Sequence, residues 1–127
     1  MPGERPAEEP RVFRTRRGEA LDVRSSPTGD VGRLYTGEGI EAVWVRKDAE
    51  QVDPDWFVQR RVDLITVLQG QLRVEFDRPG LEARTLGPGD CLVLPGATRC
   101  RAYRWPRETT EPTLFLAVYP TGPGGER

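Results

Sequence analysis

Cysteine, carboxylate and arginine side chains are the first candidates for chemistry in this chain, because its 127 residues include no histidine. Histidine is the commonest metal ligand and the side chain best suited to acid–base work near neutral pH. Cys100 stands between Arg99 and Arg101, with Arg104 four residues on, and a nearby cation favours the nucleophilic thiolate. A buried cysteine more often acts as a small apolar side chain, so we expect Cys100 to serve packing rather than catalysis.

Acidic residues gather in the segment Asp48-Ala-Glu-Gln-Val-Asp-Pro-Asp55. Carboxylates in one loop can bind Ca²⁺, but the regular ligand spacing and the turn glycine of an EF-hand are missing here. We therefore expect a solvated loop rather than a cation site.

The amino-acid composition indicates which kinds of binding partner and which cellular compartment to expect. The formal net charge is −1, with charges of both signs spread along the chain, which argues against a nucleic-acid or membrane surface. No apolar signal segment opens the sequence, and no apolar run approaches the ~20 residues of a membrane span. The two cysteines, Cys91 and Cys100, make no disulfide framework. We expect a cytoplasmic protein with reduced thiols.

Strands, rather than helices, must position these side chains. Between Asp63 and Arg104, short apolar runs alternate with glycine and proline, and Leu72, Val74 and Phe76 alternate with polar residues. That period of two is typical of a half-buried strand, so we predict consecutive antiparallel strands in a compact all-β barrel. Strands are expected at 11–15, 20–24, 32–35, 40–46, 63–69, 71–77, 81–86, 91–94, 99–105 and 113–119, with a loop at 25–30.

The chain is long enough for one domain and too short for two ordinary ones. Residues 1–10 are rich in Pro, Glu and Arg, so we expect them to be disordered. A single barrel domain is predicted over 11–120, followed by a flexible Gly/Pro tail over 121–127.

Two spacings within this region resemble the motifs of the cupin superfamily. The first motif of that family is G-x5-H-x-H-x3/4-E-x6-G, and Asp63 precedes Gly70 by the six intervening residues that separate its glutamate from its glycine. The second motif is G-x5-P-x-G-x2-H-x3-N, and Gly89 precedes Pro95 at the same spacing. The resemblance covers roughly residues 40–120 and implies a double-stranded β-helix, or jelly-roll barrel, of two antiparallel sheets.

The resemblance also places the family's ligand positions on this sequence. The first histidine pair falls on Phe57 and Gln59, or on Trp56 and Val58 with the longer spacer. The glutamate becomes Asp63. The second-motif glycine, histidine and asparagine become Ala97, Cys100 and Arg104.

This set of side chains suits a ligand pocket better than a metal. Cupin metals are generally held by three histidines and one carboxylate, and these positions offer one carboxylate, one amide and one thiol. We therefore expect no metal and no cofactor. If they bind a ligand, the pocket residues are Phe57, Gln59, Asp63, Cys100 and Arg104. Asp63, as the best candidate for acid–base chemistry, is expected to pair with Arg104 or to anchor an anionic or hydroxylated molecule.

Two classes of function follow from the resemblance. The favoured one is a non-catalytic barrel that binds a small organic molecule or serves as a structural or interaction module. The alternative is an enzyme that acts on a small organic substrate, with Asp63 as acid or base or with an atypical metal site made by Asp63, Cys100 and Gln59. Small cupins usually pair through sheet edges, so we also expect a homodimer, with Arg11–Thr15 as an exchanged strand.

Overall fold

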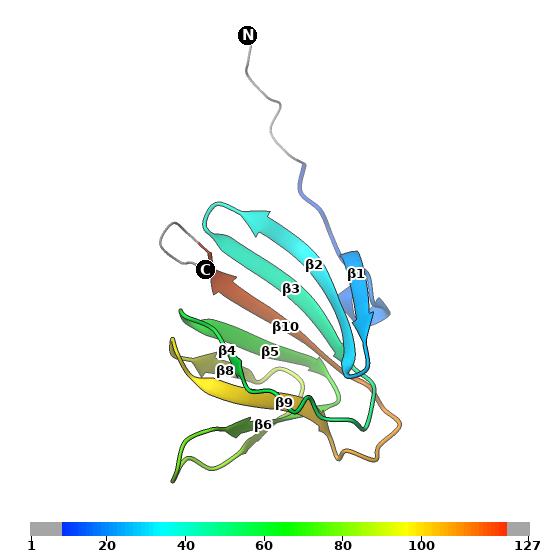
Figure 1. The fold of residues 1–127 in the computed structure, drawn as a ribbon. Coiled ribbons are helices and arrows are strands. Elements are labelled where there is room, and N and C mark those ends of the chain that lie inside the picture. Colours follow the sequence, from blue (N-terminus) through cyan, green and yellow to red (C-terminus); the bar gives the residue numbers. More distant parts are fainter. Residues whose placement is uncertain (1–8, 122–127) are drawn as a thin grey trace, which may run out of the picture.

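The structure is a computed structural model that describes residues 9–121, and β-strands make up most of it (Figure 1). One short 3₁₀ helix, η1 (Thr15–Arg17), precedes the strands. The strands of the first half are β1 (Leu21–Ser26), β2 (Gly29–Gly37), β3 (Ile40–Lys47), β4 (Phe57–Val58) and β5 (Asp63–Gln69). Those of the second half are β6 (Gln71–Phe76), β7 (Arg84–Leu86), β8 (Cys91–Leu94), β9 (Arg99–Trp105) and β10 (Thr113–Pro120).

Two antiparallel sheets form the barrel, as the sequence predicted. One sheet has the strand order β1-β2-β3-β10-β5-β8, and the other has the order β4-β9-β6-β7. In Figure 1 the strands β2, β3, β10 and β5 form one layer, and β9 and β6 lie in the layer facing it. Strands distant in sequence become neighbours: β10 pairs with both β3 and β5 and so joins the two halves of the larger sheet.

Alternating apolar residues place the core between the two sheets. Leu72 and Val74 of β6 are completely buried, as is Val67 of β5, whereas Leu64 on the opposite face of β5 is exposed. Successive side chains of a strand point to opposite faces, so this alternation fixes which face turns inward. The same rule turns Asp63 inward, because it lies one side-chain period before Ile65.

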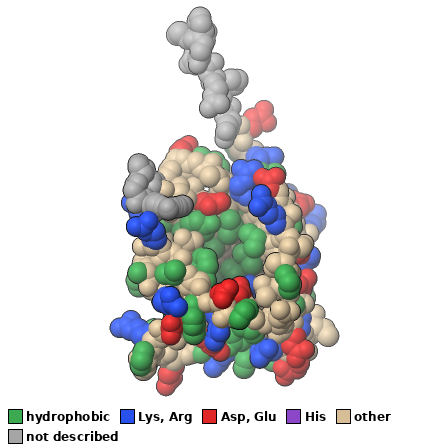
Figure 2. All heavy atoms as spheres, in the orientation of Figure 1, with side chains coloured by type: hydrophobic (Ala, Val, Ile, Leu, Met, Phe, Trp, Pro, Cys, Tyr) green, Lys and Arg blue, Asp and Glu red, His purple; other side chains and the backbone are tan. Residues whose placement is uncertain are grey.

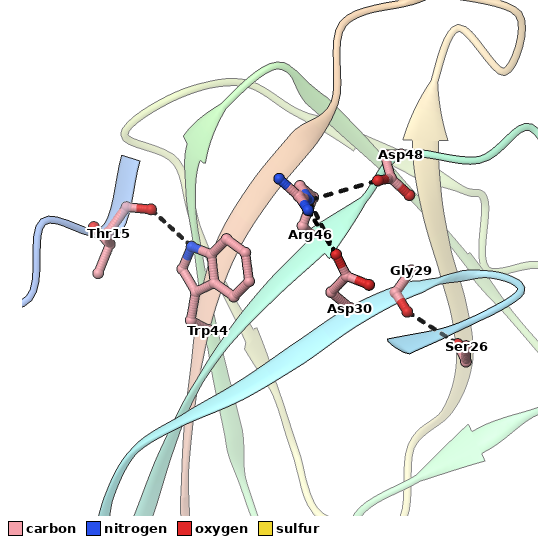
Figure 3. Close-up of polar contacts among 7 residues, drawn as sticks. All are labelled: Thr15, Ser26, Gly29, Asp30, Trp44, Arg46 and Asp48. Carbon is pink, nitrogen blue, oxygen red and sulfur yellow. Dashed lines mark hydrogen bonds and ion pairs between the residues drawn. The ribbon is translucent and has the colours of Figure 1, made fainter. Parts of the chain in front are cut away.

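The N-terminal segment differs from its prediction. Residues 11–14 have no regular structure, and Thr15 begins a 3₁₀ turn, so the strand expected at Arg11–Thr15 is wrong. The indole Nε1 of Trp44 donates a 2.8 Å hydrogen bond to the Thr15 carbonyl, which fastens this segment to its own chain (Figure 3). The exchange of this segment with a second subunit and the homodimer both stay predictions.

The loop expected at 25–30 is also mostly strand. Strands β1 and β2 continue through it and leave only a two-residue turn at Pro27 and Thr28. Ser26 closes this turn, because its hydroxyl donates to the Gly29 carbonyl at 3.1 Å (Figure 3). The other predicted strands are present, with bounds shifted by a few residues, except that β7 keeps only 84–86 of the predicted 81–86. The predictions for 1–8 and 122–127 lie outside the described residues.

Arg46 ties the end of β3 to two acidic residues. Its Nη2 atom lies 2.7 Å from Asp30 Oδ2, and its Nε atom lies 3.5 Å from Asp48 Oδ2 (Figure 3). Hydrogen bonds from Ser25 and Arg46 lower the pKa of Asp30. These contacts hold the start of the acidic loop beside the sheet. No helix in the described part of the chain has the length and apolar character that crossing a membrane requires.

Candidate functional site

A cavity of about 280 Å³ lies between the two sheets. Its walls come from β3, β5, β9 and β10, and its rim includes β4 and residues of the acidic loop. Most of the lining is apolar, with Val43 and Val45 of β3 and Phe115 and Ala117 of β10. Figure 2 shows hydrophobic side chains within a hollow on this face of the molecule, with charged side chains around it.

Four of the five predicted pocket residues meet in this cavity. Phe57, Gln59, Asp63 and Cys100 all line it, although they come from three different parts of the chain. The pairing of β4 with β9 sets Phe57 opposite Cys100. The structure thus follows the shorter spacer of the first motif, because Trp56 instead stacks on the guanidinium of Arg101, 4.1 Å from its ring centre.

Asp63 is the charged group that stands out in the cavity wall. The residue is only 2% exposed, and its Oδ1 atom has no hydrogen-bond partner among the described residues. Burial disfavours the charged form and raises the pKa of Asp63 to about 6. A carboxyl group with this pKa can accept a hydrogen bond when ionised and donate one when protonated.

Arg104 does not pair with Asp63, so the predicted ion pair is wrong. Its Nε atom donates to the Arg107 carbonyl and its Nη1 atom to the Asp48 carbonyl, each at 3.1 Å. Arg104 is buried, but it is absent from the cavity lining. The reason is its position along β9. Arg104 is four residues beyond Cys100, and at ~3.3 Å per residue it lies toward the other end of the barrel.

Cys100 packs in the hydrophobic core between the two sheets. It is buried, and burial together with the nearby Asp63 carboxylate raises the pKa of its thiol to about 11. The flanking arginines therefore do not produce a thiolate. Cys91 and Cys100 are both free, so no disulfide joins them.

The donor set does not fit a divalent metal. Around Asp63 stand a phenyl ring, a neutral amide and a thiol that stays protonated near neutral pH. A transition-metal site needs several deprotonated or imidazole ligands. No group of three Cys, Asp or Glu residues placed to hold a metal ion occurs in residues 9–121.

Two further polar residues line the cavity and were missed by the motif comparison. Tyr119 donates a 3.0 Å hydrogen bond to Glu41, and burial, that bond and the charges of Glu41 and Asp63 raise its pKa. Lys47 lies on the same face of β3 as Val43 and Val45. Strand alternation could have found both, since Lys47 is two residues beyond Val45 and Tyr119 two beyond Ala117.

The acidic loop also reaches the cavity. Asp53 and Asp55 are exposed, as expected of a solvated loop, and both also belong to the cavity lining. Arg101 lines the cavity too, but it also pairs with Glu75, with 3.1 Å between Nη2 and Oε1. The cavity thus combines apolar walls, an unpartnered carboxyl group and a rim with charges of both signs.

Solved structures with the same architecture are numerous. One is a proposed mannose-6-phosphate isomerase from Ralstonia eutropha, 22% identical, with a TM-score of 0.67 over 89% of this chain and 100% of that one. A cupin superfamily protein from Desulfitobacterium hafniense is 16% identical, with a TM-score of 0.65 over 92% and 94% of the two chains. KdgF from a Halomonas species is 28% identical, with a TM-score of 0.60 over 80% and 90%.

Other comparisons give no match: no family model and no curated protein resembles the chain closely enough. The structural likeness therefore establishes the architecture, a double-stranded β-helix. Its neighbours differ in their descriptions, and barrels of this kind carry many functions, so the activity must be argued from the cavity itself.

Proposed function

We propose that this chain, which has the fold of the cupin superfamily, binds a small organic molecule inside the barrel through apolar contacts and one hydrogen bond to Asp63. The observation that carries the proposal is the Oδ1 atom of Asp63, which is buried and has no partner in the described part of the chain. An unpaired buried acceptor costs free energy, and a ligand that donates a hydrogen bond to it recovers that cost.

The charge around Asp63 selects the kind of donor. Arg104 is engaged elsewhere. Arg101 lines the cavity and its Nε atom is buried without a partner in the described part of the chain, but its charge is already paired with Glu75 and not with Asp63. Asp53, Asp55 and Asp63 outnumber Lys47 and Arg101 among the charged lining residues. A hydroxyl or ammonium group therefore suits the cavity better than a carboxylate or phosphate. The anionic ligand considered from sequence is no longer favoured.

The volume and the lining of the cavity indicate the size and polarity of the rest of the ligand. At about 280 Å³ the cavity is just below the usual range of ligand pockets, which runs from ~300 to 1,000 Å³. Valine, phenylalanine and alanine side chains cover most of its walls. We infer an apolar body of about one aromatic ring or a short branched chain, with the donor group directed at Asp63.

One observation supports the catalytic alternative. A carboxyl group is an effective proton acceptor or donor when its pKa lies near the working pH, and the pKa of Asp63 is about 6. In this second proposal Asp63 moves a proton of a bound substrate without a metal. Binding remains the favoured function because neither an imidazole nor a thiolate stands beside Asp63 to complete a catalytic set.

Four probes with one skeleton test the binding proposal. Benzyl alcohol and benzylamine carry a donor, toluene carries none, and benzoate carries the disfavoured charge. Affinities are measured by NMR titration, following the signals of cavity residues. We expect both donors to bind more tightly than toluene, and benzoate to bind weakest.

The matched variants are Asp63→Leu, which removes the acceptor, and Asp22→Asn on the exposed surface. The first should weaken the binding of benzyl alcohol by about 10- to 150-fold, the usual range for losing a hydrogen bond to a charged group. The second should leave it unchanged. If no probe shifts the signals of cavity residues, or if toluene binds as well as benzyl alcohol, the proposal fails.

A further inference from the structure

Lys47 is the only lysine of the chain, and its side chain lines the cavity. It ends β3, where Val43, Val45 and Lys47 occupy one face of the strand. Within residues 9–121 no hydrogen bond or ion pair holds its ammonium group. All eighteen of the other basic residues are arginines. The chain therefore has one side-chain amine, and it belongs to a residue that lines the cavity.

The surroundings of Lys47 make its amine easier to deprotonate than that of an exposed lysine. Burial lowers the pKa of the amine, and the charge of Asp53 opposes that shift only in part. A neutral amine has a free lone pair and is the nucleophile that adds to carbonyl groups. Arginine has no such form in proteins, so no other side chain of this cavity could do this chemistry.

We propose that Lys47 forms a reversible Schiff base with the carbonyl group of a small aldehyde or ketone held in the cavity. The inference rests on the proposed function, because the same apolar walls hold the rest of the molecule. Lys47 pairs with Thr113 at the beginning of β10, whereas Leu64, next to Asp63, pairs with Val118 near its end. The amine and Asp63 thus stand at opposite ends of the cavity.

The reaction balances without a further reactant. The Nζ lone pair adds to the carbonyl carbon, and the carbonyl oxygen takes up a proton to give a carbinolamine. The nitrogen loses a proton, and the hydroxyl group leaves as water when a second proton reaches it. The nitrogen then loses its second proton, so the oxygen has gained the two protons that the nitrogen gives up, and the products are an imine and one water molecule. Asp53 and Asp55, which line the same cavity, are the carboxyl groups available to carry these protons at the rim.

Reductive trapping with benzaldehyde tests the inference. Sodium cyanoborohydride reduces the imine and leaves a benzyl group on the nitrogen, and peptide mapping by mass spectrometry distinguishes Lys47 from the N-terminal amine. The matched reference is Arg33→Lys, which adds an amine at an exposed position. We expect Lys47 to be trapped at pH 7 faster than that exposed amine, in the same molecule, because burial lowers the pKa of its amine and the cavity holds the aldehyde beside it.

Two comparisons separate this inference from the proposed function. Benzyl alcohol, which occupies the cavity but has no carbonyl group, should slow trapping at Lys47 and leave the exposed amine of the Arg33→Lys variant unaffected. Lys47→Arg should abolish the internal adduct while still binding benzyl alcohol. If benzyl alcohol binds but Lys47 reacts no faster than the exposed amine, the Schiff base is overturned and the binding site stands. Fast trapping that a bound benzyl alcohol does not slow also overturns it, since the carbonyl compound would then not occupy the cavity.

Discussion

Asp63 and Arg104 lie inside the same barrel, yet no hydrogen bond or ion pair joins them. Arg104 donates to the carbonyls of Asp48 and Arg107, and Asp63 Oδ1 is left without a partner in the described part of the chain. Two residues that the motif spacing brings to one site therefore have separate roles. Arg104 fastens two loops at one end of the barrel, and Asp63 gives the cavity its polar group.

The separation predicts that substitutions at the two residues act independently. Arg104→Ala should destabilise the protein, because it removes two hydrogen bonds from a charged donor to backbone carbonyls, each contributing roughly 1–3 kcal/mol. In urea unfolding, the loss should be the same, within about 0.5 kcal/mol, whether or not Asp63→Asn is present. A loss that shrinks clearly in the double variant would mean that the two side chains do interact.

Asp63 predicts an unusual dependence of stability on pH. Its pKa rises from 3.8 in the unfolded chain to about 6 in the folded protein, so the folded state holds the proton more tightly. Well below pH 4 both states are protonated and the group contributes no difference. As the pH rises through 4 to 6, the unfolded chain ionises first and the folded state loses stability. Above about pH 6 the loss levels off at about 3 kcal/mol, at 1.36 kcal/mol for each pKa unit.

Asp63→Asn cannot ionise and should escape this loss. Relative to the wild type, its free energy of unfolding should increase by up to about 3 kcal/mol between pH 4 and pH 7. Urea unfolding at a series of pH values measures the difference. A difference that stays constant over this range would show that Asp63 ionises in the folded protein as easily as in the unfolded chain.

The two cysteines should differ in reactivity. Cys91 is exposed, whereas Cys100 is buried and has a pKa of about 11, so at pH 8 only about one Cys100 thiol in a thousand is ionised. Ellman's reagent should therefore release one equivalent rapidly from the folded protein and two after unfolding. Cys91→Ser should remove the rapid equivalent. Rapid release from this variant would mean that Cys100 is accessible as a thiolate.

Gly70 should tolerate no side chain. It connects β5 to β6 with a φ of +72°, and a Cβ atom there would lie 2.8 Å from the Pro112 carbonyl oxygen. Gly80 has a similar φ of +81° but no atom within 4 Å of such a Cβ, which makes it the matched control. Gly80→Ala should cost about 1–2 kcal/mol from backbone strain alone. Gly70→Ala should cost clearly more in the same unfolding assay, and equal losses would show that the 112–113 backbone moves aside.

The strands and the inward face of each strand follow from the sequence, because both depend on neighbours a few residues apart. The alternation around Leu72 and Val74 predicts burial correctly, and the spacing from Asp63 to Gly70 predicts a buried carboxyl group before a tight turn. Pairing of β4 with β9 then brings Phe57 next to Cys100, as the motif positions implied. The prediction for residues 11–15 was wrong because Thr15 accepts a hydrogen bond from Trp44, 29 residues away. No pattern among neighbouring residues indicates that contact.

The partners of the charged side chains were decided by the tertiary structure. Spacing along β9 gives the face on which Arg104 lies, but the carbonyls that it binds come from loops at 48 and 107, and loop paths leave no periodic signal in the sequence. Lys47 lines the cavity because β3 pairs with β10. In that pairing Lys47 lies opposite Thr113, which is 66 residues later in the sequence. A charge acquires its role from what surrounds it in space. The sequence therefore identifies the carboxyl group of Asp63, and the closed barrel determines that it stands unpaired in an apolar cavity that also holds the single lysine.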